Sequence, residues 1–145
     1  MNFYKHFIGD YGRSTADLSM LEHGAYRLML DHFYGSGRPL PADKRALYRL
    51  LRAETTADKH AIDAVSLRYW RPLPEDLETL YAWLDLRTDD EQSLLRRVAQ
   101  QWGEANGLIN VRALGEIVKA AAIADKNRQI AINREAAKRA KGRAE

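Results

Sequence analysis

A stretch of 33 residues occurs twice in this chain. The string Arg38-Pro39-Leu40-Pro41 returns as Arg71-Pro72-Leu73-Pro74, and further identities follow it in register. In all, 10 of 33 aligned positions are identical without a gap, the other six pairs being Asp43/Asp76, Leu47/Leu80, Tyr48/Tyr81, Leu51/Leu84, Thr55/Thr88 and Val65/Val98. The shared string alone is compatible with chance, but the string together with its in-register followers is not. The sequence therefore predicts a duplicated unit at residues 38–70 and 71–103.

Each unit has the pattern of two helices joined by a short turn. Pro41 and Pro74 are expected in the first turn of a short helix, where proline is tolerated. A capping-box pattern then opens a longer helix, Thr55-x-x-Asp58 in the first unit and Thr88-x-x-Glu91 in the second. This is the helix-turn-helix layout. An α-solenoid is disfavoured because such folds need about three or more repeats.

Other elements flank the two units. Ser19–Glu22 has the form of a capping box, and it opens a helix whose expected buried stripe is Leu21, Ala25, Leu28, Met29, His32 and Phe33. Residues 1–11 are expected to form an extended, aromatic-rich segment. After the repeats, Leu108–Val111 alternates like a short strand, and a helix is expected from about Leu114. It continues into a basic stretch without an apolar face, which we expect to be helical or disordered and unpacked.

Composition excludes several classes of function. The chain has no cysteine, so disulfides, thiolate metal sites and cysteine nucleophiles are absent. Its four histidines do not form a ligand set, and no phosphate loop or triad pattern is present. We therefore expect no metal, no cofactor and no enzymatic activity. No apolar run is long enough to span a membrane, and no signal peptide is evident. We therefore expect the protein to be located in the cytoplasm of a bacterial host cell.

Charge is distributed unevenly along the sequence. Residues 1–125 hold 16 basic and 18 acidic side chains, whereas residues 126–145 hold 7 and 2. The repeats also differ, because residues 38–70 hold 7 basic and 4 acidic groups and residues 71–103 hold 4 and 7. One unit is therefore basic and its twin acidic. The expected organisation is a single helical domain, 1–125, followed by a basic tail, 126–145.

The basic residues are the candidates for nucleic-acid binding. In the first unit, helical spacing places the basic residues on the side of the short helix opposite Leu47, Leu50 and Leu51. In the tail, many basic residues occur with almost no acidic ones. Such groups give salt-sensitive affinity for phosphate. The candidate residues are Lys44, Arg45, Arg49, Arg52, Lys59, Arg68, Lys126, Arg128, Arg134, Lys138, Arg139, Lys141 and Arg143. A solvated face in the first unit and a solubilising tail remain the alternatives.

The acidic side chains of the second unit repel phosphate and therefore predict a different partner. That partner is a basic protein, the protein's own tail, or the basic unit of another copy in a homo-oligomer. The candidate protein-binding residues are Glu75, Asp76, Glu78, Asp85, Asp89, Asp90 and Glu91.

Residues 2–70 resemble the prophage-associated YdaU-like family. The resemblance rests on Asn2-Phe3-Tyr4, Ile8–Tyr11, Thr15–Ser19, Leu21–Leu28, Leu30–His32, Leu40–Asp43 and Tyr69-Trp70. It implies a phage or prophage protein, often encoded among replication genes, with a winged-helix-like fold and no established catalytic residues. This chain departs from that pattern where a wing is expected, because the second helical unit follows Trp70 instead.

Together these observations predict a mainly α fold, winged-helix-like, with about six helices, the duplicated two-helix unit, a minor β element and the basic tail. The expected function is that of a non-catalytic DNA-binding accessory or initiator-type protein in phage DNA replication. The alternative is a protein-interaction module that binds or inhibits a host complex through the acidic unit.

Overall fold

The computed structural model describes residues 15–103 and 106–144, and within them the chain is mainly helical with one small sheet. The helices are α2 (Met20–Ser36), α3 (Lys44–Leu50), α4 (Thr56–Tyr69), α5 (Leu77–Leu84), α6 (Asp89–Gln101) and α7 (Val111–Ala144). The strands are β1 (Leu40–Pro41), β2 (Arg71–Pro72) and β3 (Gly107–Ile109). The prediction of a mainly α chain with a minor β element is confirmed. The extended segment predicted at residues 1–11 lies outside the described residues.

The sheet joins the two units at the centre of the molecule. β3 lies between β1 and β2 and is antiparallel to both, with Leu40 opposite Leu108 and Arg71 opposite Ile109. Gly107 is required there because an added Cβ would overlap the Cβ of Pro39. The two arginine-proline strings therefore border the same central strand.

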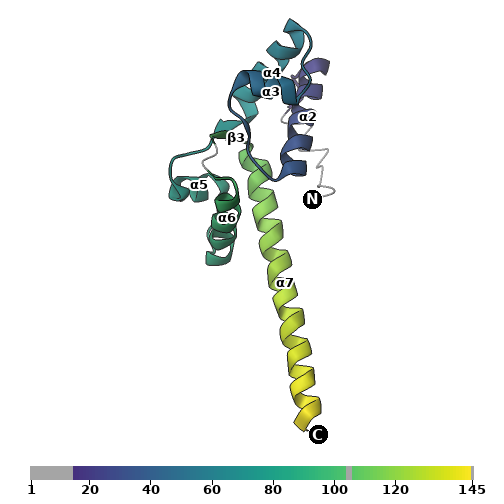
Figure 1. Ribbon diagram of the computed structural model, residues 1–145, viewed down its shortest axis with the longest axis vertical. Helices are drawn as coiled ribbons and strands as arrows, with labels where there is room; N and C mark the ends of the chain where they lie inside the picture. The colour runs from purple at the N-terminus through teal and green to yellow at the C-terminus, as the bar shows by residue number, and fades with distance from the viewer. Residues whose placement is uncertain (1–14, 104–105, 145) are drawn as a thin grey trace.

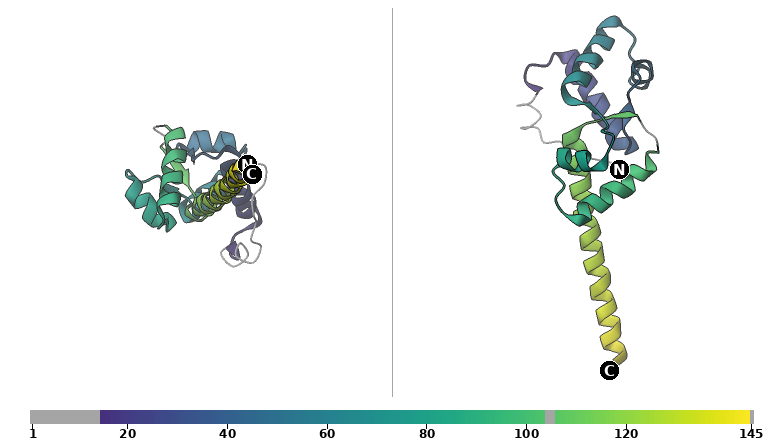
Figure 2. Two further views of the ribbon diagram at one scale, coloured as in Figure 1. Left: turned by 90° about the horizontal axis from the view of Figure 1, so that it is seen from below. Right: turned by 90° about the vertical axis from the view of Figure 1, so that its left-hand side faces the viewer.

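The helices pack in two groups around this sheet. α4 lies against α2, whereas α5 and α6 lie against the first part of α7 (Figure 1). The second part of α7 extends away from the body in Figure 1 and in the right-hand view of Figure 2, while the left-hand view of Figure 2 looks along this helix. The core is continuous across both groups, and its most deeply buried side chains include Met29, Phe33, Val65, Leu95 and Ile109.

The two 33-residue segments share their helix caps and one left-handed backbone position, although their strands use non-equivalent residues, Leu40–Pro41 in the first and Arg71–Pro72 in the second. Asp43 and Asp76 cap the short helices, and the predicted capping boxes at Thr55 and Thr88 are both present. Arg52 and Asp85, which occupy equivalent positions, are the two non-glycine residues with positive φ among the described residues, at 57° and 54°. The residue after each of them makes the same hydrogen bond: the backbone N–H of Ala53 donates to the Tyr48 carbonyl at 2.9 Å, and that of Leu86 donates to the Tyr81 carbonyl at 3.0 Å.

Several local predictions were wrong. Pro41 lies in β1 and Pro74 precedes the cap of α5, so neither proline lies in a first helical turn. Val111 belongs to α7, which begins three residues earlier than expected, because Asn110 caps it. The capping box at Ser19 is confirmed, but Leu21 and Leu28 are 44% and 46% exposed since α2 buries Tyr26 and Leu30 instead.

Candidate nucleic-acid interface

The direction of α7 is set by one buried amide. Asn110 is 4% exposed, and its Oδ1 accepts the backbone N–H of Ala113 at 2.9 Å. Its Nδ2 donates to the Tyr26 hydroxyl and the Tyr69 carbonyl, each at 3.2 Å. An asparagine at this position satisfies an N–H that the helix start leaves unpaired. Asn110 thereby ties α7 to α2 and α4.

The first part of α7, Val111 to Asp125, is packed against the second unit. Leu114 and Val118 are buried, and Gly115 faces the Leu84 backbone, where an added Cβ would lie 3.5 Å from the carbonyl oxygen. Asp125 ends this part and pairs with Arg97 at 3.5 Å and with Arg128 at 3.3 Å. From residue 126 to residue 144 every side chain is exposed.

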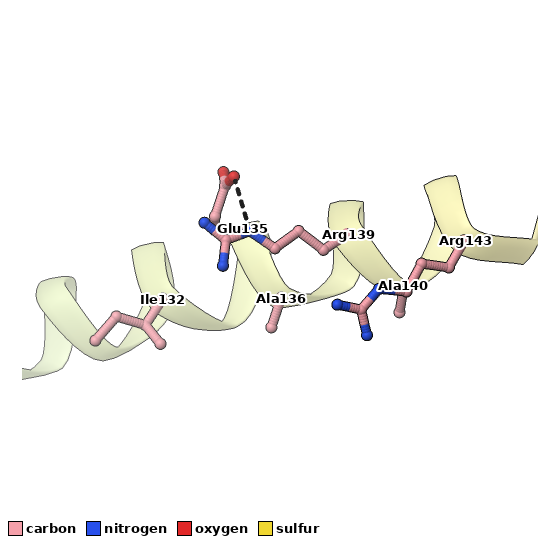
Figure 3. A pocket seen from close by; sticks show the side chains of 6 residues that line it. All are labelled: Ile132, Glu135, Ala136, Arg139, Ala140 and Arg143. Carbon is pink, nitrogen blue, oxygen red and sulfur yellow. Dashed lines mark ion pairs between the residues drawn. The ribbon is translucent and has the colours of Figure 1, made fainter.

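This exposed stretch, called here the free half of α7, is strongly basic. All seven predicted tail cations lie on it, and Glu135 is the one acid among its described residues. Glu135 pairs with Arg139 at 3.7 Å, within the same helix (Figure 3). The prediction of an unpacked tail, in its helical form, is confirmed. The free half therefore presents positive charge to solvent, and of its described cations Arg128 pairs with Asp125 and Arg139 with Glu135.

The first unit carries a second basic surface. Arg45 and Arg49 are exposed on α3, on the side opposite the buried Leu47, and Arg52 follows the helix. Lys59, on α4, lies 5.7 Å from the centroid of the Tyr48 ring. These four cations are accessible on α3, its C-terminal end and the start of α4.

Two of the predicted phosphate contacts are held within the chain. Lys44 Nζ lies 3.8 Å from Asp63 Oδ2, and Arg68 Nη1 donates to both carboxylate oxygens of Asp17 at 2.8 Å. This pairing lowers the pKa of Asp17 and raises that of Arg68. Arg68 also lies about 13 Å along α4 from Lys59. The structure therefore does not place Arg68 with the cations of α3.

Helix ends account for most of the acidic residues in the second unit. Asp76 accepts the Thr79 N–H at 2.7 Å, which lowers the Asp76 pKa. Glu91 completes the capping box of α6, and Asp85 accepts from Arg87 Nε at 2.8 Å. Asp89 and Asp90 occupy the first turn of α6, where negative charge is favoured by the helix dipole. Glu75 and Glu78 are exposed beside the cap of α5.

A groove of about 790 Å³ lies between the two units. Its wall includes Leu67, 89% exposed, and Trp70, which is buried and whose indole N–H has no hydrogen-bond partner. At the other side, Arg71 stacks 4.0 Å from the centroid of the Trp83 ring. Sequence reasoning missed this groove because residues from both units form it.

The described residues contain neither a metal-binding cluster nor a membrane-spanning helix. In residues 15–103 and 106–144, no cluster of three or more histidine, aspartate or glutamate side chains is arranged to hold a metal ion. None of the helices described is both long and apolar enough to cross a lipid bilayer.

Sequence reasoning also missed Asn110, although a signal was present. An asparagine directly after a strand and before a helical pattern is a favoured N-cap. The predicted strand extended through Val111 and so concealed it.

Fold and surface thus define a mainly helical protein with a small central sheet and an exposed basic helix. Residues 2–71 match the model of a family described as "Protein of unknown function (DUF1376)". The chain is also 38% identical over 52 residues to a protein of Escherichia coli (strain K12) described as "Uncharacterized protein YdaU". That match covers 36% of this chain and 18% of the relative's length. No solved structure matches the chain. This amino-terminal segment, 70 of the chain's 145 residues, is thus similar to a family of unknown function, in agreement with the resemblance to the YdaU-like family that the sequence predicted.

Proposed function

We propose that this protein is a non-catalytic DNA-binding factor of prophage origin, of the accessory or initiator type, acting in phage DNA replication. The observation that carries the proposal is the free half of α7, where seven cations accompany one described acid on an exposed helix. Neutralising DNA phosphates releases condensed counterions, so such a surface binds duplex DNA with steep salt dependence. The replication role rests on the prophage association of the family.

The first unit supplies a second contact in this proposal. Arg45, Arg49, Arg52 and Lys59 are exposed together with the start of α4, as expected if a helix-turn-helix unit meets a phosphate backbone. The winged-helix relationship belongs to the same proposal, with β3 as the strand from which a wing would be built. We also infer that the two units arose by duplication. Asp43 and Asp76 cap the short helices at equivalent positions, and Arg52 and Asp85, also equivalent, both have a left-handed backbone.

The test is a titration of a fluorescent generic duplex with the full chain and with a chain truncated after Asp125, at several salt concentrations. If all seven tail cations contact phosphates, log K falls with log [salt] with a slope of about −6. Truncation should remove most of that slope. No measurable affinity of the full chain at low salt would overturn the proposal.

The contribution of the first unit is measured separately by changing Arg45, Arg49 and Arg52 to Gln in the full chain. A weaker complex with a smaller salt slope supports docking of this unit. Unchanged binding would show that the tail alone holds the DNA.

A protein-interaction module is the second candidate, and the groove between the units favours it. Its exposed Leu67 offers an apolar contact at the wall of this groove. The acidic residues of the second unit support this role less, because helix capping accounts for most of them. A host-protein complex that survives Leu67→Asp would count against the groove.

A further inference from the structure

Four of the uncharged residues of the free half of α7 form one continuous stripe, while Asn127, Ile130, Ala131, Ile132 and Ala137 lie elsewhere around the helix. Gln129, Asn133, Ala136 and Ala140 are separated by four, three and four positions, the spacing of residues on one helix face. Gln129 Nε2 donates to Asn133 Oδ1 at 3.1 Å, so the two amides lie side by side on the exposed surface. This set is called the amide-alanine stripe below.

Cations flank this stripe on both sides. At about 100° per residue, Arg128, Arg139 and Arg143 lie about 50–110° to one side of the stripe's centre, and Lys126, Lys141 and Arg134 lie about 50–130° to the other, whereas Lys138 lies about 170° away, opposite the stripe. Figure 3 shows Arg143 beside Ala140 on the face that also contains Ala136. A hollow of about 440 Å³ lies beside the stripe on the Arg139 side, and because all six of its lining residues, Ile132 and Glu135 among them, belong to α7 it is a helix surface and not an enclosed cavity. Glu135 lies about 130° from the centre of the stripe.

We propose that the free half of α7 lies in the major groove of duplex DNA, with the amide-alanine stripe toward the base edges and the two cationic flanks toward opposite phosphate backbones. This inference rests on the proposed DNA binding and specifies its geometry. The major groove is about 12 Å wide and admits a helix about 10–12 Å across. Alanines keep the inserted side narrow, and the acid faces away from the groove floor.

The chemistry of the stripe fits base edges. Asn and Gln amides pair with adenine, and alanine methyl groups contact the thymine methyl group. The hydrogen bond between Gln129 and Asn133 does not use Gln129 Oε1 or Asn133 Nδ2. Both residues are exposed, so this acceptor and this donor can face the base edges. Continuous basic helices that enter the major groove are an established mode of DNA binding. The charge pattern on both flanks favours this mode over binding along a single backbone.

The decisive experiment uses two matched substitutions of the full chain. Ala136→Leu adds bulk to the stripe, whereas Ala131→Leu makes the same change about 170° away from the stripe's centre on the same exposed helix. Both changes keep the charge and the helix propensity. With a fluorescent AT-containing duplex we expect Ala136→Leu to lower the affinity about tenfold and Ala131→Leu to leave it unchanged. Equal effects of the two changes would overturn the major-groove placement.

Two further measurements separate this inference from the proposed function. Neutralising either cationic flank to Gln should weaken binding, and methyl green in the major groove should compete while netropsin in the minor groove should not. If the full chain binds DNA but netropsin displaces it, or only one flank matters, the major-groove geometry is wrong and the proposed function stands. If the full chain does not bind DNA, and instead self-associates at low salt through its tail, both proposals fail.

Discussion

The two halves of α7 differ in both burial and charge. Val111 to Asp125 packs against α5 and α6, whereas residues 126–144 are exposed throughout. The packed half has two cations and two acids, and the free half has seven cations and one acid. Burial therefore stabilises the first half, and charge dominates the second. A residue's contribution to stability or to binding depends on which side of Asp125 it lies.

The free half must be held helical by local interactions and by the helix that precedes it. Isolated helices of about 12–15 residues are marginal in water. Here the packed half supplies the nucleus, while the Glu135–Arg139 pair and the Gln129–Asn133 hydrogen bond lie at the favourable spacing of four residues. The body thus presents the basic helix already formed, which reduces the ordering cost of binding.

The sharpest test of this division replaces one large aliphatic residue in each half. Leu114→Ala removes a side chain that is 3% exposed, and we expect it to lower the free energy of unfolding by about 2–5 kcal/mol. Ile132→Ala removes one that is 54% exposed, and the expected change is within about 0.5 kcal/mol. Urea denaturation followed by circular dichroism measures both. A comparable loss in the two variants would show that the free half packs against something.

The junction before the packed half gives the next largest effect. Asn110→Ala removes the cap of α7 and the donor to Tyr26 and Tyr69, which should cost about 1–3 kcal/mol of unfolding free energy. Asn127→Ala makes the same change at an exposed position in the free half and should leave stability within about 0.5 kcal/mol. Equal unfolding midpoints for the two variants would contradict the role assigned to Asn110.

The helix boundaries of the body were the most predictable part of the fold. The capping boxes at Ser19, Thr55 and Thr88 depend on residues three positions apart, so the sequence alone specifies them. The repeat also predicted equivalent geometry in both units. Arg52 and Asp85 share a left-handed backbone although their side chains differ, because the turn after the short helix is the same.

Long-range contacts were not predictable in the same way. β1 and β2 have two residues each and are defined by pairing with β3, which follows more than 30 residues later. Bonds between the units, such as Arg38 Nη2 to the Trp102 carbonyl at 3.3 Å, have no local signature. The exposure of Leu21 and Leu28 likewise depends on which side of α2 receives a partner.

The sequence predicted which residues make up the candidate site, but it did not predict how their side chains are arranged around the helix. A count of charges identifies the basic tail directly. The amide-alanine stripe emerges only once residues 126–144 are placed on an uninterrupted helix, because Gln129, Asn133, Ala136 and Ala140 are separated in the sequence by charged neighbours. Charge counting also does not reveal the ion pairs that Lys44 and Arg68 make with Asp63 and Asp17.

The smallest expected effect is the pH dependence of stability, and it should arise from residues that precede α7. Backbone N–H groups at helix starts lower the pKa of Glu22, Asp58 and Asp76, and none of these residues lies on α7. A lowered folded-state pKa means that the stabilisation is present above the unfolded-state pKa and is lost as pH falls through the folded-state pKa. Thermal stability should therefore decline between about pH 5 and pH 3. Asp58→Asn should flatten that decline, while truncation after Asp125 should leave its slope unchanged. A slope that changes on truncation but not in Asp58→Asn would place the pH-sensitive groups on the free half of α7 instead.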